Sequence, residues 1–162
     1  MNGKQSTKTA KNIGSIYNNE AIASLALGLF IRNLKVISIP KTMLILAFLL
    51  HEPTAKKLRS ISLKRSLEEF VLKNPEVVMG FNSRFIDFLS LSVNSLTILQ
   101  DANVITMDRE FIYFNNQSYF YPEDYKDVGN RSSNMFRSVE ALCAILSESD
   151  VNTFYLNLKI EL

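Results

Sequence analysis

Two apolar stretches near the start of the chain limit its possible folds more than any other feature. The first is Ala21–Ile31, and the second, Met43–Leu50, is the longest uninterrupted apolar run, with eight residues. A helix needs about 20 apolar residues to cross a bilayer, so neither run can span a membrane. The residues before them are polar and basic and lack the apolar core of a secretory signal. We therefore expect two buried helices in a cytoplasmic protein that has no membrane partner.

The residues around these runs predict where helices begin and end. Asn18 or Asn19 is suited to cap a helix over the first run. Pro40 suits the first turn of a second helix, Lys41–His51, and Pro53 is expected to end it. Further helical segments are predicted at Thr54–Arg59 (a basic turn or helix), Leu63–Lys73 (capped by Ser62), Pro75–Leu89, Ser92–Asn103 (capped by Ser92 or Asn94) and Ser132–Ser147.

Two short β-prone runs, Val104–Met107 and Phe111–Phe114, are separated by a three-residue loop and predict a hairpin. Three helices followed by a hairpin is the order of a winged helix. The predicted fold is therefore mainly α: a winged-helix-like core of three helices and a β-hairpin, with a C-terminal helix. Residues 1–17 are expected to form a flexible basic tail, and residues 18–162 a single domain. The last segment, Val151–Leu162, fits either a strand or a short helical turn.

The chain is poor in residues that carry catalysis or bind metals. It contains one His, His51, and one Cys, Cys143, so it can form neither a Cys/His zinc cluster nor an internal disulfide. Cys143 lies in an apolar helical stripe and is predicted to be a core residue. His51 is expected to interact with the carbonyls at the end of its helix. We predict a protein that is not an enzyme and needs no cofactor or metal; a hydrolase or nuclease built on His51 is the least favoured alternative.

Charge is distributed unevenly along the chain. Residues 1–65 hold 11 basic and 2 acidic residues, and residues 66–162 hold 7 basic and 14 acidic ones. A basic region can bind nucleic acid or an acidic protein surface, although it can also be merely solvated. The candidate DNA- or partner-binding residues are Lys56, Lys57, Arg59, Lys64, Arg65, Arg84 and Arg109.

The helix that would read DNA in a winged helix is poorly suited to do so. Ser92–Asn103 contains no Lys or Arg and carries Asp101, and Arg109 is the one basic residue between Arg84 and Lys126. Affinity for DNA depends largely on neutralising phosphates, so sequence-specific binding through this helix is disfavoured.

Several short features follow one another in a fixed order along residues 18–160. They are the apolar helix ending in His51 with Glu52-Pro53-Thr54 and the basic stretch to Leu58; Ser66-Leu67 with Phe70 and Asn74-Pro75-Glu76; Phe81 with Arg84, Ser95-Leu96 and Val104-Ile105; and the segment Asp150–Tyr155. In this order and spacing the chain resembles the middle component of bacterial three-component ABC ATPase systems, the group that includes the Lamassu-type antiphage defence complexes.

The resemblance implies an accessory role. Such a subunit would bind an SMC-like coiled-coil ABC ATPase and help to hold or release an effector subunit of the nuclease type in response to foreign DNA. Contact with DNA would then be made through the complex. The alternative suggested by the predicted helices and hairpin is a winged-helix DNA-binding transcription regulator.

Overall fold

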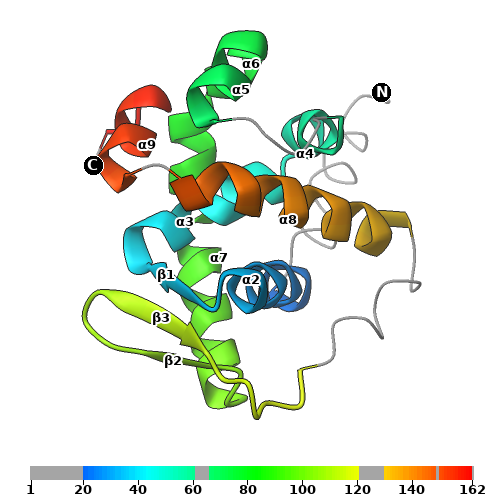
Figure 1. Ribbon diagram of the computed structural model, residues 1–162, viewed down its shortest axis with the longest axis vertical. Coiled ribbons are helices and arrows are strands. Elements are labelled where there is room, and N and C mark those ends of the chain that lie inside the picture. Colours follow the sequence, from blue (N-terminus) through cyan, green and yellow to red (C-terminus); the bar gives the residue numbers. More distant parts are fainter. Residues whose placement is uncertain (1–19, 61–65, 121–129, 149, 162) are drawn as a thin grey trace, which may run out of the picture.

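The computed structural model describes residues 20–60, 66–120, 130–148 and 150–161, and it is mainly helical with a small antiparallel sheet (Figure 1). The helices are α2 (Glu20–Leu34), α3 (Ile39–Leu49), α4 (Glu52–Arg59), α5 (Leu67–Lys73), α6 (Pro75–Val78), α7 (Phe81–Asp101), α8 (Asn130–Glu148) and α9 (Val151–Asn157). The strands are β1 (Val36–Ser38), β2 (Ile105–Met107) and β3 (Phe111–Phe114). The predicted helical fold with a hairpin is confirmed. In the described ranges, none of these helices has both the length and the apolar character that a membrane span requires.

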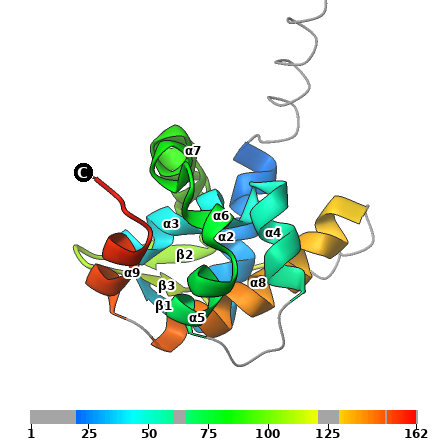
Figure 2. The same cartoon turned by 90° about the horizontal axis from the view of Figure 1, so that it is seen from above.

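The two apolar runs form α2 and α3, which lie at the centre of the fold. Helix α7 packs on one side of them and α8 on the other (Figure 2). Phe30 of α2 and Phe48 of α3 are fully buried, and the ring of Phe48 lies 4.8 Å from that of Phe81 in α7. Burying one such side chain stabilises the fold by roughly 1.5–3 kcal/mol, so these helices hold the other elements in place.

The hairpin acquires a third strand that the sequence did not predict. Strand β1 pairs with β3 on the side opposite β2, which gives the order β1-β3-β2 with all pairs antiparallel. Ile37 lies opposite Ile112 in the register, and both side chains are buried. Strand β1 has only three residues between two helices, too few to show an alternating pattern. It begins directly after Lys35, whose φ of 67° ends α2.

The predicted break between helices 75–89 and 92–103 is wrong. The chain instead breaks earlier, at Gly80, which has a left-handed φ of 66° and separates the short α6 from the continuous α7. Ser92 was a plausible helix cap, but it is a fully buried residue inside α7. Glycine adopts a positive φ without steric cost, which explains why the break occurs at this position.

Two predicted helix boundaries also need correction. Pro53 does not end a helix: α3 already stops at Leu49, and Pro53 lies in the first turn of α4, a position that suits proline. Helix α5 begins at Leu67, where the Ser66 hydroxyl accepts a hydrogen bond from the Glu69 N–H at 3.3 Å. The predicted cap Ser62 lies outside the described residues.

The C-terminal segment is helical rather than extended over Val151–Asn157. The Asp150 side chain caps this helix by accepting a hydrogen bond from the Asn152 N–H at 3.0 Å. The predicted helix 132–147 is confirmed as α8, and its apolar stripe joins the core. The predicted basic tail, 1–17, and the candidate caps Asn18 and Asn19 lie outside the described residues.

Candidate interaction surfaces

The predicted basic residues of α4 are largely engaged within the chain. Lys57 forms an ion pair with Glu76 at 3.0 Å, and Arg59 forms one with Glu52 at 2.6 Å. The Arg59 side chain is only 15% exposed. Lys56 is exposed and forms no ion pair with a residue in the part of the chain that the structure describes. The other two members of this predicted cluster, Lys64 and Arg65, lie outside the described residues.

The predicted binding residue Arg84 is instead held by contacts within the chain. Its guanidinium donates hydrogen bonds to the carbonyl oxygens of Met79 at 2.9 Å and Val77 at 2.5 Å, and it lies over the ring of Phe81 at 5.4 Å. Burial lowers the pKa of this guanidinium from its ordinary value. Arg84 therefore holds the turn around Gly80 that joins α6 to α7.

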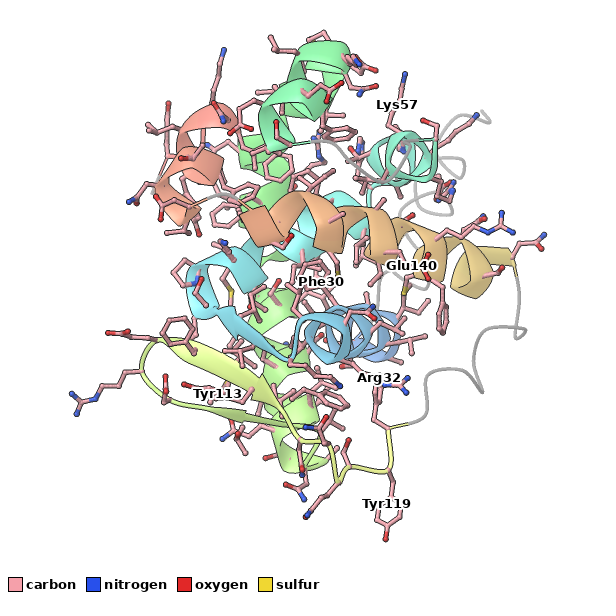
Figure 3. All side chains as sticks on the ribbon, viewed as in Figure 1. Phe30, Arg32, Lys57, Tyr113, Tyr119 and Glu140 are labelled. Atoms are coloured by element: carbon pink, nitrogen blue, oxygen red, sulfur yellow. The ribbon has the colours of Figure 1, made fainter. Side chains whose placement is uncertain are left out.

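Arg109 is exposed in the hairpin loop, far from α4. The loop is fixed by Asp108, whose carboxylate accepts hydrogen bonds from the N–H groups of Glu110 and Phe111 and from the Tyr113 hydroxyl, at 2.7–2.8 Å. These bonds lower the pKa of Asp108. Figure 3 shows Tyr113 and Lys57 at opposite ends of the molecule. The structure thus separates the hairpin cation from the basic residues of α4.

His51 does not cap the helix that precedes it, contrary to the sequence expectation. It occupies the N-cap position of α4, and its Nδ1 lies 2.7 Å from the Thr54 hydroxyl. Burial and then the charge of Arg84 lower the pKa of His51. Among the described residues, no group of three His, Cys, Asp or Glu side chains is arranged to hold a metal ion.

Cys143 packs against the core, as predicted. Burial, with a smaller effect from Glu140, raises the pKa of its thiol to about 12. A thiol with so high a pKa stays protonated at neutral pH, and only the thiolate is a good nucleophile. Cys143 is therefore suited to packing in the core and not to acting as a nucleophile.

An apolar cleft of about 640 Å³, which the sequence did not predict, lies between α5, α6, the start of α7 and the end of α9. We call it the α5–α9 cleft. Its walls include Val71, Leu72, Val78, Met79 and Leu158. Leu72 is 81% exposed and Met79 is 74% exposed, so two large apolar side chains of this cleft are open to solvent. Exposed apolar side chains gathered at a concave surface are typical of a binding site.

Helix α9 and the residues that follow it contact distant parts of the chain beside the cleft. The Tyr155 hydroxyl donates to the carbonyl of Pro40 at 3.1 Å, and the Asn157 amide donates to Glu68 at 3.4 Å. The Glu161 N–H donates to the side-chain oxygen of Asn82 at 3.2 Å. The cleft joins residues near 71–82 to residues near 157–159, a proximity that periodicity cannot reveal. The one available signal was Leu72, which lies off the apolar stripe of its helix.

Comparison with known proteins gave one match. Residues 15–162 match the family model "ABC-three component (ABC-3C) system Middle Component 3". Searches of curated proteins and of solved structures each returned no match. The matched range contains the α5–α9 cleft and all the basic residues predicted to bind DNA or a partner.

Proposed function

Because this chain belongs to the Middle Component 3 family of ABC-three component systems, we propose that it is a non-catalytic accessory subunit that binds an SMC-like coiled-coil ABC ATPase. In this proposal it helps to hold or release a nuclease-type effector in a Lamassu-type response to foreign DNA. Family membership supports the accessory role, and the surface of the chain supports a role in binding other proteins.

The observation that carries the proposal is the α5–α9 cleft. Covering an exposed Leu or Met side chain stabilises a complex by roughly 1.5–3 kcal/mol at most, so Leu72 and Met79 together can anchor an interface. Among the described residues that line the cleft, Lys159 carries the only formal charge. We therefore assign to the cleft an apolar segment of the ATPase component that carries a carboxylate facing Lys159.

The hydrogen bonds of Arg84 to the turn beside this cleft support the same interpretation. The guanidinium holds the carbonyls of Val77 and Met79, which keeps the α6–α7 turn in place. Gly80 and Phe81 in that turn line the cleft. A wall that is fixed before binding loses little conformational freedom when a partner docks.

The alternative, a winged-helix transcription regulator, draws on the fold. The order α2, β1, α3, then α7 and the β2–β3 hairpin, with strands arranged β1-β3-β2, supports a winged-helix core in which α7 takes the place of the reading helix. Arg84 is the only basic residue of α7, and its guanidinium is bound to carbonyls of the chain. Phosphate binding therefore lacks anchors on α7, and we favour the protein-binding function.

In this proposal, the subunit contacts DNA as part of the assembled complex. Lys56 and Arg109 are the exposed candidates for such a contact, because Lys57, Arg59 and Arg84 are already bound to acceptors within the chain. Lys64 and Arg65 remain predicted contacts.

Co-expression with the other two components tests this function. The tagged full chain should retain the ATPase component on an affinity column at a fixed ratio. Leu72→Lys, which places a charge in the cleft, should reduce the retained ATPase at least tenfold. Tyr119→Lys is the matched control, since Tyr119 is 91% exposed and does not line the cleft. Equal retention by both variants, or no retention by the wild-type protein, would contradict the proposal.

A further inference from the structure

Two asparagine side chains lie in the walls of the α5–α9 cleft, which are otherwise mainly apolar. Asn82 lies in the first turn of α7, and Asn157 is the last residue of α9. Both line the cleft, and both are partly exposed. Helices α5, α6 and α9 lie together at one end of the molecule (Figure 1). A side-chain amide that is covered without a hydrogen-bond partner costs free energy, so these two residues determine what an occupant of the cleft has to offer.

One end of each amide is already bound within the chain, and the chemistry of the two partners sets which end. The backbone N–H of Glu161 can only donate, and it donates to Oδ1 of Asn82 at 3.2 Å. An ionised carboxylate can only accept, and Glu68 accepts from Nδ2 of Asn157 at 3.4 Å. A hydrogen bond to the Ser66 side chain, and then one to the backbone N–H of Glu68, lower the pKa of this carboxyl, which keeps it ionised at neutral pH. The orientation of both amides is thereby fixed.

The opposite ends of the two amides are left to a partner. They are a donor, Nδ2 of Asn82, and an acceptor, Oδ1 of Asn157, and no hydrogen bond within the described part of the chain uses either atom. A carbonyl and an N–H of a peptide main chain match this pair. The interior of a helix uses its own carbonyls and N–H groups, whereas an extended segment leaves them available. A helix in the cleft would cover both amide ends without pairing them with its main chain, and an extended segment would pair both.

We propose that the α5–α9 cleft binds an extended segment of the ATPase component through the main chain of that segment. One carbonyl of the segment accepts from Nδ2 of Asn82, and one N–H donates to Oδ1 of Asn157. Successive side chains of an extended chain point to opposite sides, so apolar residues at every second position pack on Leu72 and Met79. An acidic side chain meets Lys159. The cleft and the partner are those of the proposed function, on which this inference rests.

Short overlapping peptides that tile the ATPase component, each labelled with fluorescein, provide the probe, and fluorescence anisotropy measures their binding to the full chain. At least one peptide should bind and be released by Leu72→Lys, which locates it in the cleft. Asn82→Asp keeps the acceptor for the Glu161 N–H but removes the donor. It should weaken the binding of that peptide at least tenfold, which corresponds to about 1.4 kcal/mol. An acidic residue is favourable in the first turn of a helix, so this variant should keep the wild-type Tm.

Asn94→Asp is the matched control. It makes the same substitution on the same helix, at an exposed position that does not line the cleft and lies roughly 18 Å from Asn82 along α7. It should leave the peptide affinity unchanged within twofold. Because Asn82→Asp also adds a negative charge, the measurement is repeated with a peptide in which the acidic residue is replaced by its amide. The loss caused by Asn82→Asp should persist with this peptide.

Ester substitution tests recognition of the main chain directly. Replacing one peptide bond of the ligand by an ester removes one N–H and makes the adjoining carbonyl a weaker acceptor. Esters at one or two positions should weaken binding at least fivefold, and esters elsewhere should not. The ester at the carbonyl that binds Asn82 should have a smaller effect in Asn82→Asp than in the wild-type chain, because two changes to one hydrogen bond are not additive.

The outcomes that overturn the inference differ from those that overturn the proposed function. A peptide that Leu72→Lys releases, but that tolerates every ester and binds Asn82→Asp with wild-type affinity, would be recognised through its side chains alone. A peptide that gains a helical circular dichroism signal on binding would also refute the inference, and so would the absence of any binding peptide from an ATPase that the full chain retains. The proposed function stands in all three cases. Failure of the wild-type chain to retain the ATPase instead removes the proposed function itself.

Discussion

Replacing Arg84 by methionine distinguishes a structural role of this residue from a role in binding DNA. The substitution keeps an aliphatic side chain over the Phe81 ring but removes every donor that holds the carbonyls of Val77 and Met79. Hydrogen bonds from a charged donor contribute about 1.5–3 kcal/mol each in favourable settings. Arg84 is partly exposed, so we expect the pair of bonds to contribute about 2–3 kcal/mol in total.

Urea unfolding followed by circular dichroism measures this loss of unfolding free energy directly, and thermal unfolding of the same variant measures it as a decrease in Tm. For a chain of this length, about 2–3 kcal/mol lowers Tm by about 4–12 °C. The matched control is Arg109→Met, since Arg109 is exposed at the hairpin loop and its replacement should change stability by less than about 0.5 kcal/mol. Equal stability of the two variants would refute the reasoning. A variant at Arg84 that folds normally but loses DNA affinity would identify Arg84 as a DNA contact instead.

Two further predictions concern the single Cys and the single His. Cys143, whose pKa burial raises to about 12, should react with iodoacetamide in the native protein at least about a hundredfold more slowly than in urea, as mass spectrometry would measure; equal rates would place the thiol at the surface. His51 has a lowered pKa when folded, so the unfolded chain binds its proton more tightly. Its contribution to stability is complete above its ordinary pKa of about 6.5 and decreases as the pH falls below that value. His51→Gln should lose less stability than the wild-type protein between pH 7.5 and 5, and parallel curves would contradict this.

The elements with strong local signals were predictable. Helix α2, helix α8 and the β2–β3 hairpin occur close to the expected residues because apolar periodicity and alternation mark them. The errors lie where a local signal was ambiguous. Ser92 resembles a cap, but tertiary packing buries it inside α7, and the actual break depends on the left-handed backbone of Gly80.

The candidate site was less predictable than the fold. A cluster of basic residues in sequence suggested a shared surface, yet Lys57 and Arg59 are paired with acids and Arg84 holds a turn. The positions of charged residues along the sequence do not show which acid will pair with which base in the folded chain. The α5–α9 cleft depends on α9 returning to α5 and α7, a contact between residues about 80 positions apart. No short-range pattern encodes such a contact.

Hydrogen exchange on the full chain, with and without the ATPase component, tests whether this subunit binds its partner through the α5–α9 cleft. We expect slower exchange in peptides that cover 67–82 and 151–161 when the ATPase is added, with little change in the hairpin at 105–114. Slower exchange confined to the hairpin or to α4, or no change anywhere at saturating ATPase, would contradict it.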